Sequence, residues 1–316
     1  MNKILIIRFS SIGDIVLTTP LIRCIKEQLP DAEIHYLTKE KFYPVIKANN
    51  YISHVHIFND KLGSTIRTLK KNRFNYIVDL HKNLRSFRVK MALLKPSGTF
   101  NKLNRQKWLM VNMKINNLPD VHIVDRYFNA VKALGVTNDG RGLDYFIPDE
   151  DRLDRNDLPP SHANGFVAFV IGGMHYTKML PDEKVMELCK KIEKPVILMG
   201  GRDDMAKAER ITLQCDHKIY NGCGIYNINQ SASIISMADK VISDDTGLMH
   251  VAAAFKKEIY SIWGNTIPEF GMYPYMPGNE KNSHIMEVKD LNCRPCSKIG
   301  YSGCPKKHFR CMMDID

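Results

Sequence analysis

The chain has 316 residues, and at roughly 150 residues per domain this length predicts two domains, each large enough for a core of its own. Its composition is 44% apolar, 25% charged and 9% aromatic, which excludes a wholly disordered chain, a collagen-like repeat and a small disulfide scaffold. The longest apolar runs stay well below the roughly 18 uncharged residues that a membrane-spanning helix needs. Only four apolar residues follow Lys3 before Arg8, too few for a secretory signal, so we expect a cytoplasmic protein.

The positive charge is concentrated in one segment. The whole chain carries +11, whereas Lys61–Lys114 has fourteen basic residues and a single acidic one, Asp79, and so carries +13. This concentration of positive charge predicts a surface that binds a polyanion, such as a phosphorylated lipid, a nucleic acid or an acidic glycan. The alternative interpretation is a basic face that only contacts solvent. The aromatic residues within it do not complete a known nucleic-acid-binding module, so we expect no nucleic-acid partner.

Short apolar runs alternate with amphipathic stretches in both halves of the chain, which is typical of βαβ units and parallel sheets. In the first half we predict strands at Lys3–Ile7, Glu33–Leu37, His54–Phe58 and Tyr76–Leu80, and helices at Ile15–Gln28, Ser64–Lys71 and His122–Leu134. In the second half we predict strands at Phe166–Ile171, Pro195–Met199, Lys240–Ser243 and Ile259–Trp263, and helices at Asp182–Lys191, Asp203–Gln214, Asn229–Met237 and Thr246–Phe255.

Between the two halves, Thr137–Asn164 is rich in Asp, Gly and Pro and shows no sustained periodicity, so its later part is interpreted as a linker. We therefore predict an α/β protein with two Rossmann-like, doubly wound domains, at residues 1–158 and 159–316. In open sheets of this kind ligands bind beyond the carboxyl ends of the strands, so the residues after each strand are the candidates for a site.

The first strand is followed by Arg8-Phe-Ser-Ser-Ile-Gly-Asp14 and then by an apolar helix. Ser10 or Ser11 can cap that helix, and an acid in its first turn is favoured by the helix dipole. Alternatively, Asp14 faces the ligand side of the sheet as a general base that takes a proton from a hydroxyl nucleophile.

In the second half, a buried strand runs into Asp244-Asp-Thr-Gly-Leu-Met-His250. Gly247 leaves the first-turn amides of the next helix uncovered, which predicts an anion site suited to a diphosphate. His250 lies four residues after Thr246 and therefore on the same helical face, although a buried core histidine is the alternative interpretation.

Two glycine-containing strand ends complete the candidate site. Gly172-Gly-Met-His-Tyr-Thr-Lys178 places Lys178 where it can reach a phosphate, unless it is an ordinary surface lysine. Gly200-Gly-Arg-Asp-Asp204 offers acids that can accept hydrogen bonds from ribose hydroxyls, or that simply cap the next helix.

Taken in order, these pieces resemble glycosyltransferase family 9, the heptosyltransferases of lipopolysaccharide core assembly. The motifs that carry the resemblance are Ser10-Ser-Ile-Gly-Asp14 with Leu17-Thr-Thr-Pro20, Asp79-Leu-His-Lys-Asn-Leu-Arg-Ser86, Thr177-Lys178 and Asp245-Thr-Gly-Leu-Met-His250. The resemblance implies a GT-B fold with two domains facing a central cleft, the acceptor on the N-terminal domain and the nucleotide sugar on the C-terminal one. It further implies an ADP-heptose donor, inversion at the anomeric centre and no required metal or other cofactor.

The resemblance also implies roles for individual residues. Asp14 is the general base, and Lys178 holds the donor diphosphate. The remaining donor-site residues are Thr177, Asp204, Asp245, Thr246, Gly247 and His250, and the acceptor-site residues are Ser11, Gly13, Arg85, Ser86 and Arg88. The acceptor is a phosphorylated lipid A core or another lipid-linked glycan, so the basic segment suggests peripheral attachment to the anionic cytoplasmic face of the inner membrane.

One departure concerns the donor site. Related enzymes often have Lys-x-Trp-Pro where this chain has Lys178-Met-Leu-Pro181, so the sugar can differ. Two alternatives to the heptosyltransferase hypothesis stay open, namely a non-catalytic protein of the same fold that binds nucleotide sugars or membrane surfaces, and a GT-B enzyme that uses a UDP-sugar.

The C-terminal tail contains four of the eight cysteines, at Cys293, Cys296, Cys304 and Cys311. In a reducing cytoplasm this spacing suggests a structural zinc site, with His308 as an alternative ligand, or else a packed tail of reduced thiols, which we favour.

Overall fold

The computed structural model describes residues 2–215 and 218–316, which divide into two compact units. The first unit extends through Lys102 and includes Val121–Phe146, and the second consists of Leu103–Asp120 and Ile147–Asp316. This division differs from the predicted boundary between residues 158 and 159. The segment Leu103–Asp120 belongs to the second unit because its lysines contact that unit: Lys107 lies 5.2 Å from the ring centroid of Phe270, and Lys114 Nζ donates to Pro295 O at 2.7 Å.

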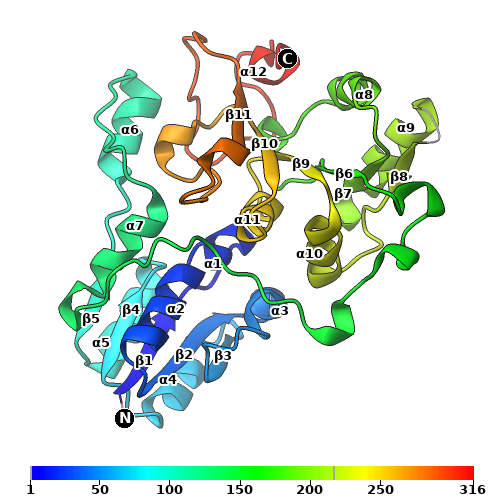
Figure 1. Cartoon of the computed structure of the whole chain (residues 1–316). Helices are drawn as coiled ribbons and strands as arrows, with labels where there is room; N and C mark the ends of the chain where they lie inside the picture. Colours follow the sequence, from blue (N-terminus) through cyan, green and yellow to red (C-terminus); the bar gives the residue numbers. More distant parts are fainter. Residues whose placement is uncertain (1, 216–217) are drawn as a thin grey trace. The chain divides into compact units, whose positions relative to one another are not determined.

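The first unit is built on a five-stranded parallel sheet with the strand order β3-β2-β1-β4-β5 (Figure 1). Its strands are β1 (Asn2–Ile7), β2 (Ala32–Lys39), β3 (His54–Phe58), β4 (Tyr76–Asp79) and β5 (Ser97–Thr99). Its helices are α1 (Ile12–Val16), α2 (Thr19–Gln28), α3 (Tyr43–Ile46), α4 (Leu62–Lys70), α5 (Leu84–Leu93) and α7 (Ile123–Tyr127).

The second unit has a six-stranded parallel sheet with the order β11-β10-β9-β6-β7-β8 (Figure 1). Its strands are β6 (Val167–Val170), β7 (Val196–Met199), β8 (Ile219–Asn221), β9 (Lys240–Asp244), β10 (Glu258–Trp263) and β11 (Ser283–Glu287). Its helices are α6 (Asn104–Met113), α8 (Asp182–Lys191), α9 (Met205–Gln214), α10 (Ile228–Met237), α11 (Gly247–Ala254) and α12 (Arg310–Met313).

The central strands β1 and β6 carry long apolar runs because helices cover both faces of such sheets. Residues Ile4–Ile7 of β1 and all of β6 are buried. Both strand orders are those of Rossmann-like sheets, which confirms the predicted fold class of two doubly wound α/β domains of the GT-B type. The described residues contain no helix that is long and apolar enough to cross a membrane.

The predicted elements appear with small differences. The predicted helix Ile15–Gln28 is two helices, because Pro20 lies in the first turn of α2 and cannot continue α1. The predicted helix His122–Leu134 is reduced to α7 and two short 3₁₀ turns. The elements that we did not predict are short or carry little apolar periodicity, namely β5, β8, β11, α3, α5, α6 and α12.

Each sheet reverses its strand order at one point, and ligands of doubly wound folds bind at the carboxyl ends of the strands there. In the first unit this switch point lies between β1 and β4, which lead into Arg8–Asp14 and the residues after Asp79. In the second unit it lies between β6 and β9, which lead into Gly172–Lys178 and Asp245–Gly247. The topology therefore places the predicted motifs at the two switch points.

Candidate active site

Asp14 lies in the first turn of α1, directly beyond the carboxyl end of β1. Its Oδ2 accepts hydrogen bonds from Ser11 N at 3.1 Å and from Ser11 Oγ at 2.9 Å. Its Oδ1 is ion-paired with Arg8 Nη2 at 2.5 Å, and the carboxylate keeps 20% of its side-chain surface exposed. Asp14 is thus oriented by its neighbours and still open to solvent on one side.

Arg8 is the residue that sets the charge of Asp14, and the sequence analysis did not recognise it. Its guanidinium is buried and also donates to Ser10 O at 2.7 Å, to Leu80 O and to the Tyr127 hydroxyl at 3.3 Å. Burial by itself would raise the pKa of Asp14, but the charge of Arg8 and the hydrogen bonds from Ser11 outweigh it, so the net pKa lies below its usual value. Asp14 is therefore ionised at neutral pH and can accept a proton, although as a weakened base.

The β4–α5 connection is organised by Asp79, which is 1% exposed. Its Oδ1 accepts from Lys82 N at 2.7 Å, while its Oδ2 accepts from Ser86 Oγ at 2.9 Å. Ser86 is fully buried and its hydroxyl also accepts from Asn83 N, which forms the capping box of α5. The Ser86 hydroxyl is thus occupied by partners inside the protein, and its contact with the acceptor stays a prediction.

The other predicted acceptor residues differ in accessibility. Arg85 and Arg88 are exposed on α5, and Ser11 is exposed beside Asp14. Gly13 is buried within α1, and its contact with the acceptor stays a prediction.

His81 is a second residue that the sequence analysis missed. Its ring packs against Phe9 with a centroid distance of 4.9 Å, and its Nδ1 is buried without a hydrogen-bond partner among the described residues. Burial, and next the positive charges of Arg8 and Lys102, lower the pKa of His81 to about 4. A neutral imidazole therefore follows β4 at the switch point, where it can donate or accept one hydrogen bond.

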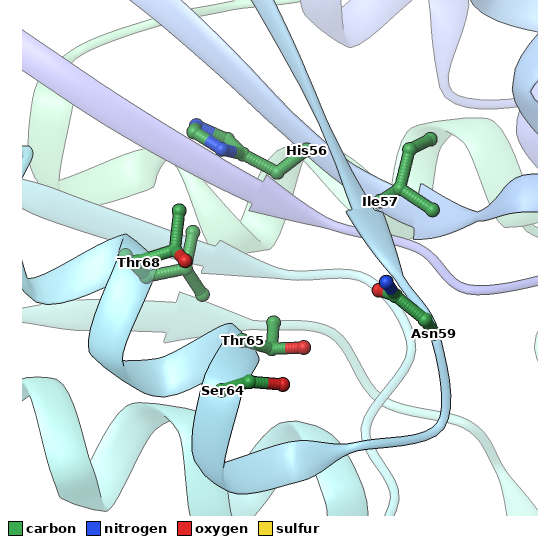
Figure 2. A pocket seen from close by; sticks show the side chains of 7 residues that line it. His56, Ile57, Asn59, Ser64, Thr65 and Thr68 are labelled. Carbon is green, nitrogen blue, oxygen red and sulfur yellow. The ribbon is translucent and has the colours of Figure 1, made fainter.

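A small cavity of about 180 Å³ occurs elsewhere in the first unit, between β3 and α4 (Figure 2). Its lining includes His56, Asn59, Ser64 and Thr65 and none of the predicted site residues. The hydroxyls of Ser64 and Thr65 both donate to Lys61 O, at 2.9 and 3.1 Å, so they serve the first turn of α4.

In the second unit, Lys178 and Asp245 come together at the switch point between β6 and β9. Lys178 Nζ donates to Asp245 Oδ2, which also accepts from Thr266 Oγ1 at 3.0 Å. Thr246 is the N-cap of α11 and Gly247 its first residue, and both are partly exposed. A lysine ammonium and the first-turn amides of an eight-residue helix thus occur on neighbouring segments, an arrangement that suits a diphosphate.

Asp204 lies next to the glycines that follow β6 and β7. Its Oδ2 accepts from Gly201 N at 2.8 Å, and an added Cβ at Gly172 or Gly200 would overlap with the Asp204 side chain. Burial raises the pKa of Asp204. The glycines therefore leave room for this carboxyl group, whose hydrogen bond to Gly201 N belongs to the short 3₁₀ turn Arg202–Asp204, while its side chain makes no cap hydrogen bond to α9. Its contact with the ribose stays a prediction.

Asp244 is a titratable group that the sequence analysis did not single out. It is fully buried at the end of β9, and its Oδ2 accepts from Leu180 N at 3.3 Å. Burial raises its pKa to about 7, against the opposing charge of Lys207. Its Oδ1 has no hydrogen-bond partner among the described residues, so no donor stabilises that oxygen in the charged form, in agreement with the raised pKa.

Two predicted donor-site residues are buried. Thr177 is 1% exposed, and its Oγ1 accepts a hydrogen bond from Tyr301 N at 2.8 Å. It thereby links the C-terminal tail to the loop that follows β6. His250 is 2% exposed within α11, which agrees with the alternative interpretation of a core histidine. The structure places both side chains in the interior, and their contact with the donor stays a prediction.

All eight cysteines of the chain are free thiols, and the tail cysteines Cys293, Cys296 and Cys304 act electrostatically on Cys311. Cys293 Sγ lies 3.8 Å from His308 Nε2, and both border a cavity of about 410 Å³. Burial, and then the charges of Cys296, Cys304 and Cys293, raise the pKa of Cys311 to about 12. The Cys311 thiol therefore stays protonated unless a cation stabilises its thiolate. Among the described residues, the tail cysteines do not form a group of three or more ligand atoms that could hold a metal ion, so the candidate zinc site stays a prediction.

Comparison with known proteins decides the family. The sequence profile of glycosyltransferase family 9 (heptosyltransferase) matches residues 62–304, which is more than half of the chain. This chain belongs to glycosyltransferase family 9. It is 24% identical over 283 residues to lipopolysaccharide heptosyltransferase 3 of Escherichia coli strain K12, with 80% of each chain covered.

Solved structures agree with the fold of this glycosyltransferase. It is similar to a family 9 glycosyltransferase from Veillonella parvula, with a TM-score of 0.75, 20% identity and coverage of 95% of this chain and 94% of that chain. It is also similar to the E. coli heptosyltransferase WaaC solved with ADP, with a TM-score of 0.69, 19% identity and coverage of 90% and 92%. The predicted family and the predicted class of enzyme are thereby confirmed.

Proposed function

We propose that this family 9 enzyme transfers a heptose from ADP-heptose to a hydroxyl of a lipopolysaccharide core acceptor, with inversion and with Asp14 as the general base. The observation that carries the proposal is the ionised, oriented and partly exposed carboxylate of Asp14 at the switch point of the first sheet. The curated relative acts on lipopolysaccharide by its name, and the solved relative WaaC was obtained with ADP.

The proposed reaction is a single displacement. Asp14 takes the proton of the acceptor hydroxyl, and the acceptor oxygen forms a bond to the anomeric carbon from the face opposite the leaving group. The bond between the anomeric carbon and the diphosphate oxygen breaks, and its electron pair leaves with ADP. Because the new bond forms opposite the old one, the configuration is inverted.

The negative charge that develops on the diphosphate needs stabilisation. In this proposal it comes from the Lys178 ammonium and from the first-turn amides of α11, so that no divalent metal is required. Asp245 holds Lys178 before the donor binds and would release it to the phosphates, while Thr266 keeps a hydrogen bond to Asp245. Accordingly, we assign the nucleotide sugar to the second unit and the acceptor to the first.

A titration with nucleoside diphosphates tests the donor side. Calorimetry of the full chain with ADP, UDP, GDP and CDP, each with and without EDTA, should give binding that is selective for ADP and unchanged by EDTA. A preference for UDP would indicate a UDP-sugar transferase, and loss of binding in EDTA would contradict the metal-independent scheme. Absence of any binding would favour a non-catalytic protein of the same fold.

The acceptor is lipid-linked in this proposal, and α5 provides a surface for a cytoplasmic membrane face. Four large apolar residues of this helix and its C-cap are 52–79% exposed, namely Leu84, Phe87, Met91 and Leu94. Their spacing places them on one face, next to the exposed Arg88. We infer that this face attaches peripherally to anionic lipid.

Vesicle binding tests this attachment. The wild-type chain should sediment with vesicles that contain phosphatidylglycerol and be released by high salt, and Phe87→Glu should weaken binding at low salt. The exposed Leu213 on α9 of the second unit provides the matched control, because Leu213→Glu should leave binding unchanged. Equal binding of both variants would contradict a role for α5.

A further inference from the structure

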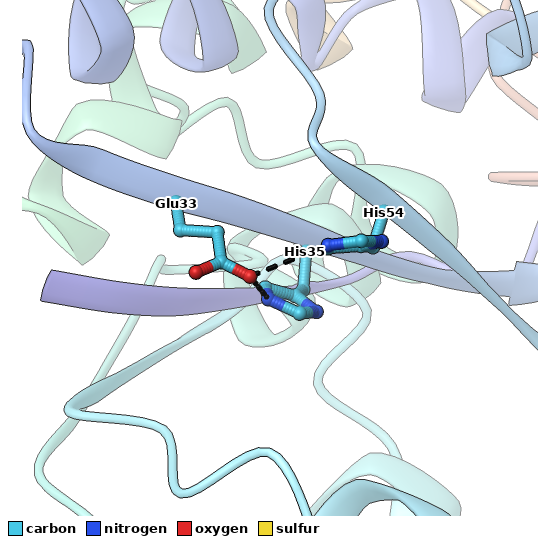
Figure 3. A group of neighbouring side chains, drawn as sticks. All are labelled: Glu33, His35 and His54. Atoms are coloured by element: carbon cyan, nitrogen blue, oxygen red, sulfur yellow. Dashed lines mark hydrogen bonds and ion pairs between the residues drawn. The ribbon is translucent and has the colours of Figure 1, made fainter. Parts of the chain in front are cut away.

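Two neighbouring strands of the first sheet bring three metal-ligating side chains together. His35 of β2 and His54 of β3 are register partners, and Glu33 precedes His35 by two residues. Because side chains alternate between the faces of a strand, all three project from the same face. Figure 3 shows one carboxylate oxygen of Glu33 facing both imidazoles, and one ligand atom from each residue lies within 4.8 Å of the others.

The distances match those within a first coordination sphere. Glu33 Oε1 lies 2.9 Å from His35 Nε2 and 3.3 Å from His54 Nε2. In a tetrahedral zinc site with bonds of about 2.0–2.1 Å, neighbouring ligand atoms are about 3.3 Å apart. His54 has a side chain that is 60% exposed and begins the edge strand, so it can rotate to adjust the remaining separation.

The surroundings also fit a metal ligand set. His35 Nδ1 lies 2.8 Å from His56 Nε2, so that a metal on His35 Nε2 would leave an Nδ1–H that donates to His56. Metal-bound histidines usually have such a second partner, which fixes the ring orientation. Lys3 Nζ holds the other carboxylate oxygen, Glu33 Oε2, at 3.2 Å, which leaves Oε1 for the metal.

We propose that Glu33, His35 and His54 bind a divalent transition-metal ion of the zinc class, with the fourth position open to solvent. The site involves the amino-terminal half of β2 and the first residue of β3. Asp14, in contrast, follows the carboxyl end of β1 in the same parallel sheet. The metal would therefore join the edge strand β3 to β2 and stabilise the first unit, and it takes no part in sugar transfer.

Cobalt binding tests the proposal, because Co²⁺ occupies zinc sites and its visible spectrum reports its ligands. Titration of the metal-free full chain should produce visible bands that lack an accompanying thiolate charge-transfer band, and Zn²⁺ should displace them. This distinguishes the Glu-His-His site from any metal held by the tail cysteines. Two variants, Glu33→Gln and His54→Asn, should weaken the Co²⁺ affinity of the Glu-His-His site at least tenfold. The circular dichroism spectra of the metal-free variants should match that of the metal-free wild type.

His284 offers a matched control, since its Nε2 lies 3.4 Å from Glu258 Oε1 on adjacent strands of the second sheet. His284→Asn should leave the cobalt affinity unchanged. As a second readout, Zn²⁺ should shift an imidazole NMR signal that is absent from the spectrum of the His54→Asn chain. Equal metal affinity in the wild type and in His54→Asn, or a cobalt spectrum with thiolate character only, would overturn the proposal and leave a plain hydrogen-bonded Glu–His cluster.

Discussion

The substitution Asp14→Asn separates the chemistry of this enzyme from its binding of the donor. The amide keeps the size of the carboxyl group but cannot take the acceptor proton, so kcat should fall by about 10²–10⁴, the usual contribution of a general base. The donor half-site that we propose lies in the second unit, around Lys178 and Asp245. The affinity for ADP should therefore stay within about twofold of the wild-type value, the order of error of such a titration.

The same substitution has a calculable cost in stability. Arg8 would lose its charged partner at 2.5 Å but keep its hydrogen bonds to Ser10 O and to the Tyr127 hydroxyl. Loss of one charge-assisted hydrogen bond lowers the free energy of unfolding by about 1.5–3 kcal/mol, which leaves a typical domain folded at 25 °C. Urea unfolding should show this decrease, and circular dichroism should show an unchanged fold.

A matched control is Ser11→Ala, which removes a 2.9 Å hydrogen bond to Asp14 but leaves the carboxylate and Arg8 in place. We expect its kcat to fall much less than that of the Asp14→Asn enzyme, since the carboxylate is retained and still accepts from Ser11 N and pairs with Arg8. The general-base role is refuted if the Asp14→Asn enzyme turns over within threefold of the wild type. If the variant also loses ADP binding, the defect is general and not chemical.

Three further predictions follow from contacts in the two units. Lys178→Ala should weaken ADP binding roughly 10- to 150-fold in calorimetry, the loss of one charge-assisted bond, whereas Lys194→Ala, at the exposed ion pair with Asp239, should not change it. Ser86→Ala should lower the free energy of unfolding by about 1–2 kcal/mol in urea without changing the KM for acceptor, and a raised KM with unchanged stability would restore Ser86 as an acceptor contact. Burial raises the pKa of Asp244 to about 7, so between about pH 4 and 7 the folded chain binds more protons at this group than the unfolded chain does, and the free energy of unfolding should fall as the pH rises. The Asp244→Asn chain should lose this pH dependence in urea unfolding. Identical pH profiles of the two chains would contradict the prediction.

The order of elements could be predicted from the sequence because helix and strand periodicities are local. The strand His54–Phe58 and the helix Asp182–Lys191 have the predicted bounds, and the conspicuous motifs follow strands as expected. Elements without an apolar signal were missed: β5 is a Ser-Gly-Thr segment that forms a strand because β4 offers it hydrogen-bond partners. The order of strands within each sheet is also a property of long-range pairing, which periodicity does not encode.

The sequence by itself determined the family, the two Rossmann-like halves and the positions of Asp14, Lys178 and Asp245, because short motifs at strand ends are local features. Only the tertiary structure decided the state of these groups. Asp14 is ionised because Arg8 pairs with it, and Tyr127, 119 residues further along, helps to hold Arg8. Burial depends on what folds over a side chain from elsewhere, and for that reason the interior positions of Ser86, Thr177 and His250 became visible only in the folded protein.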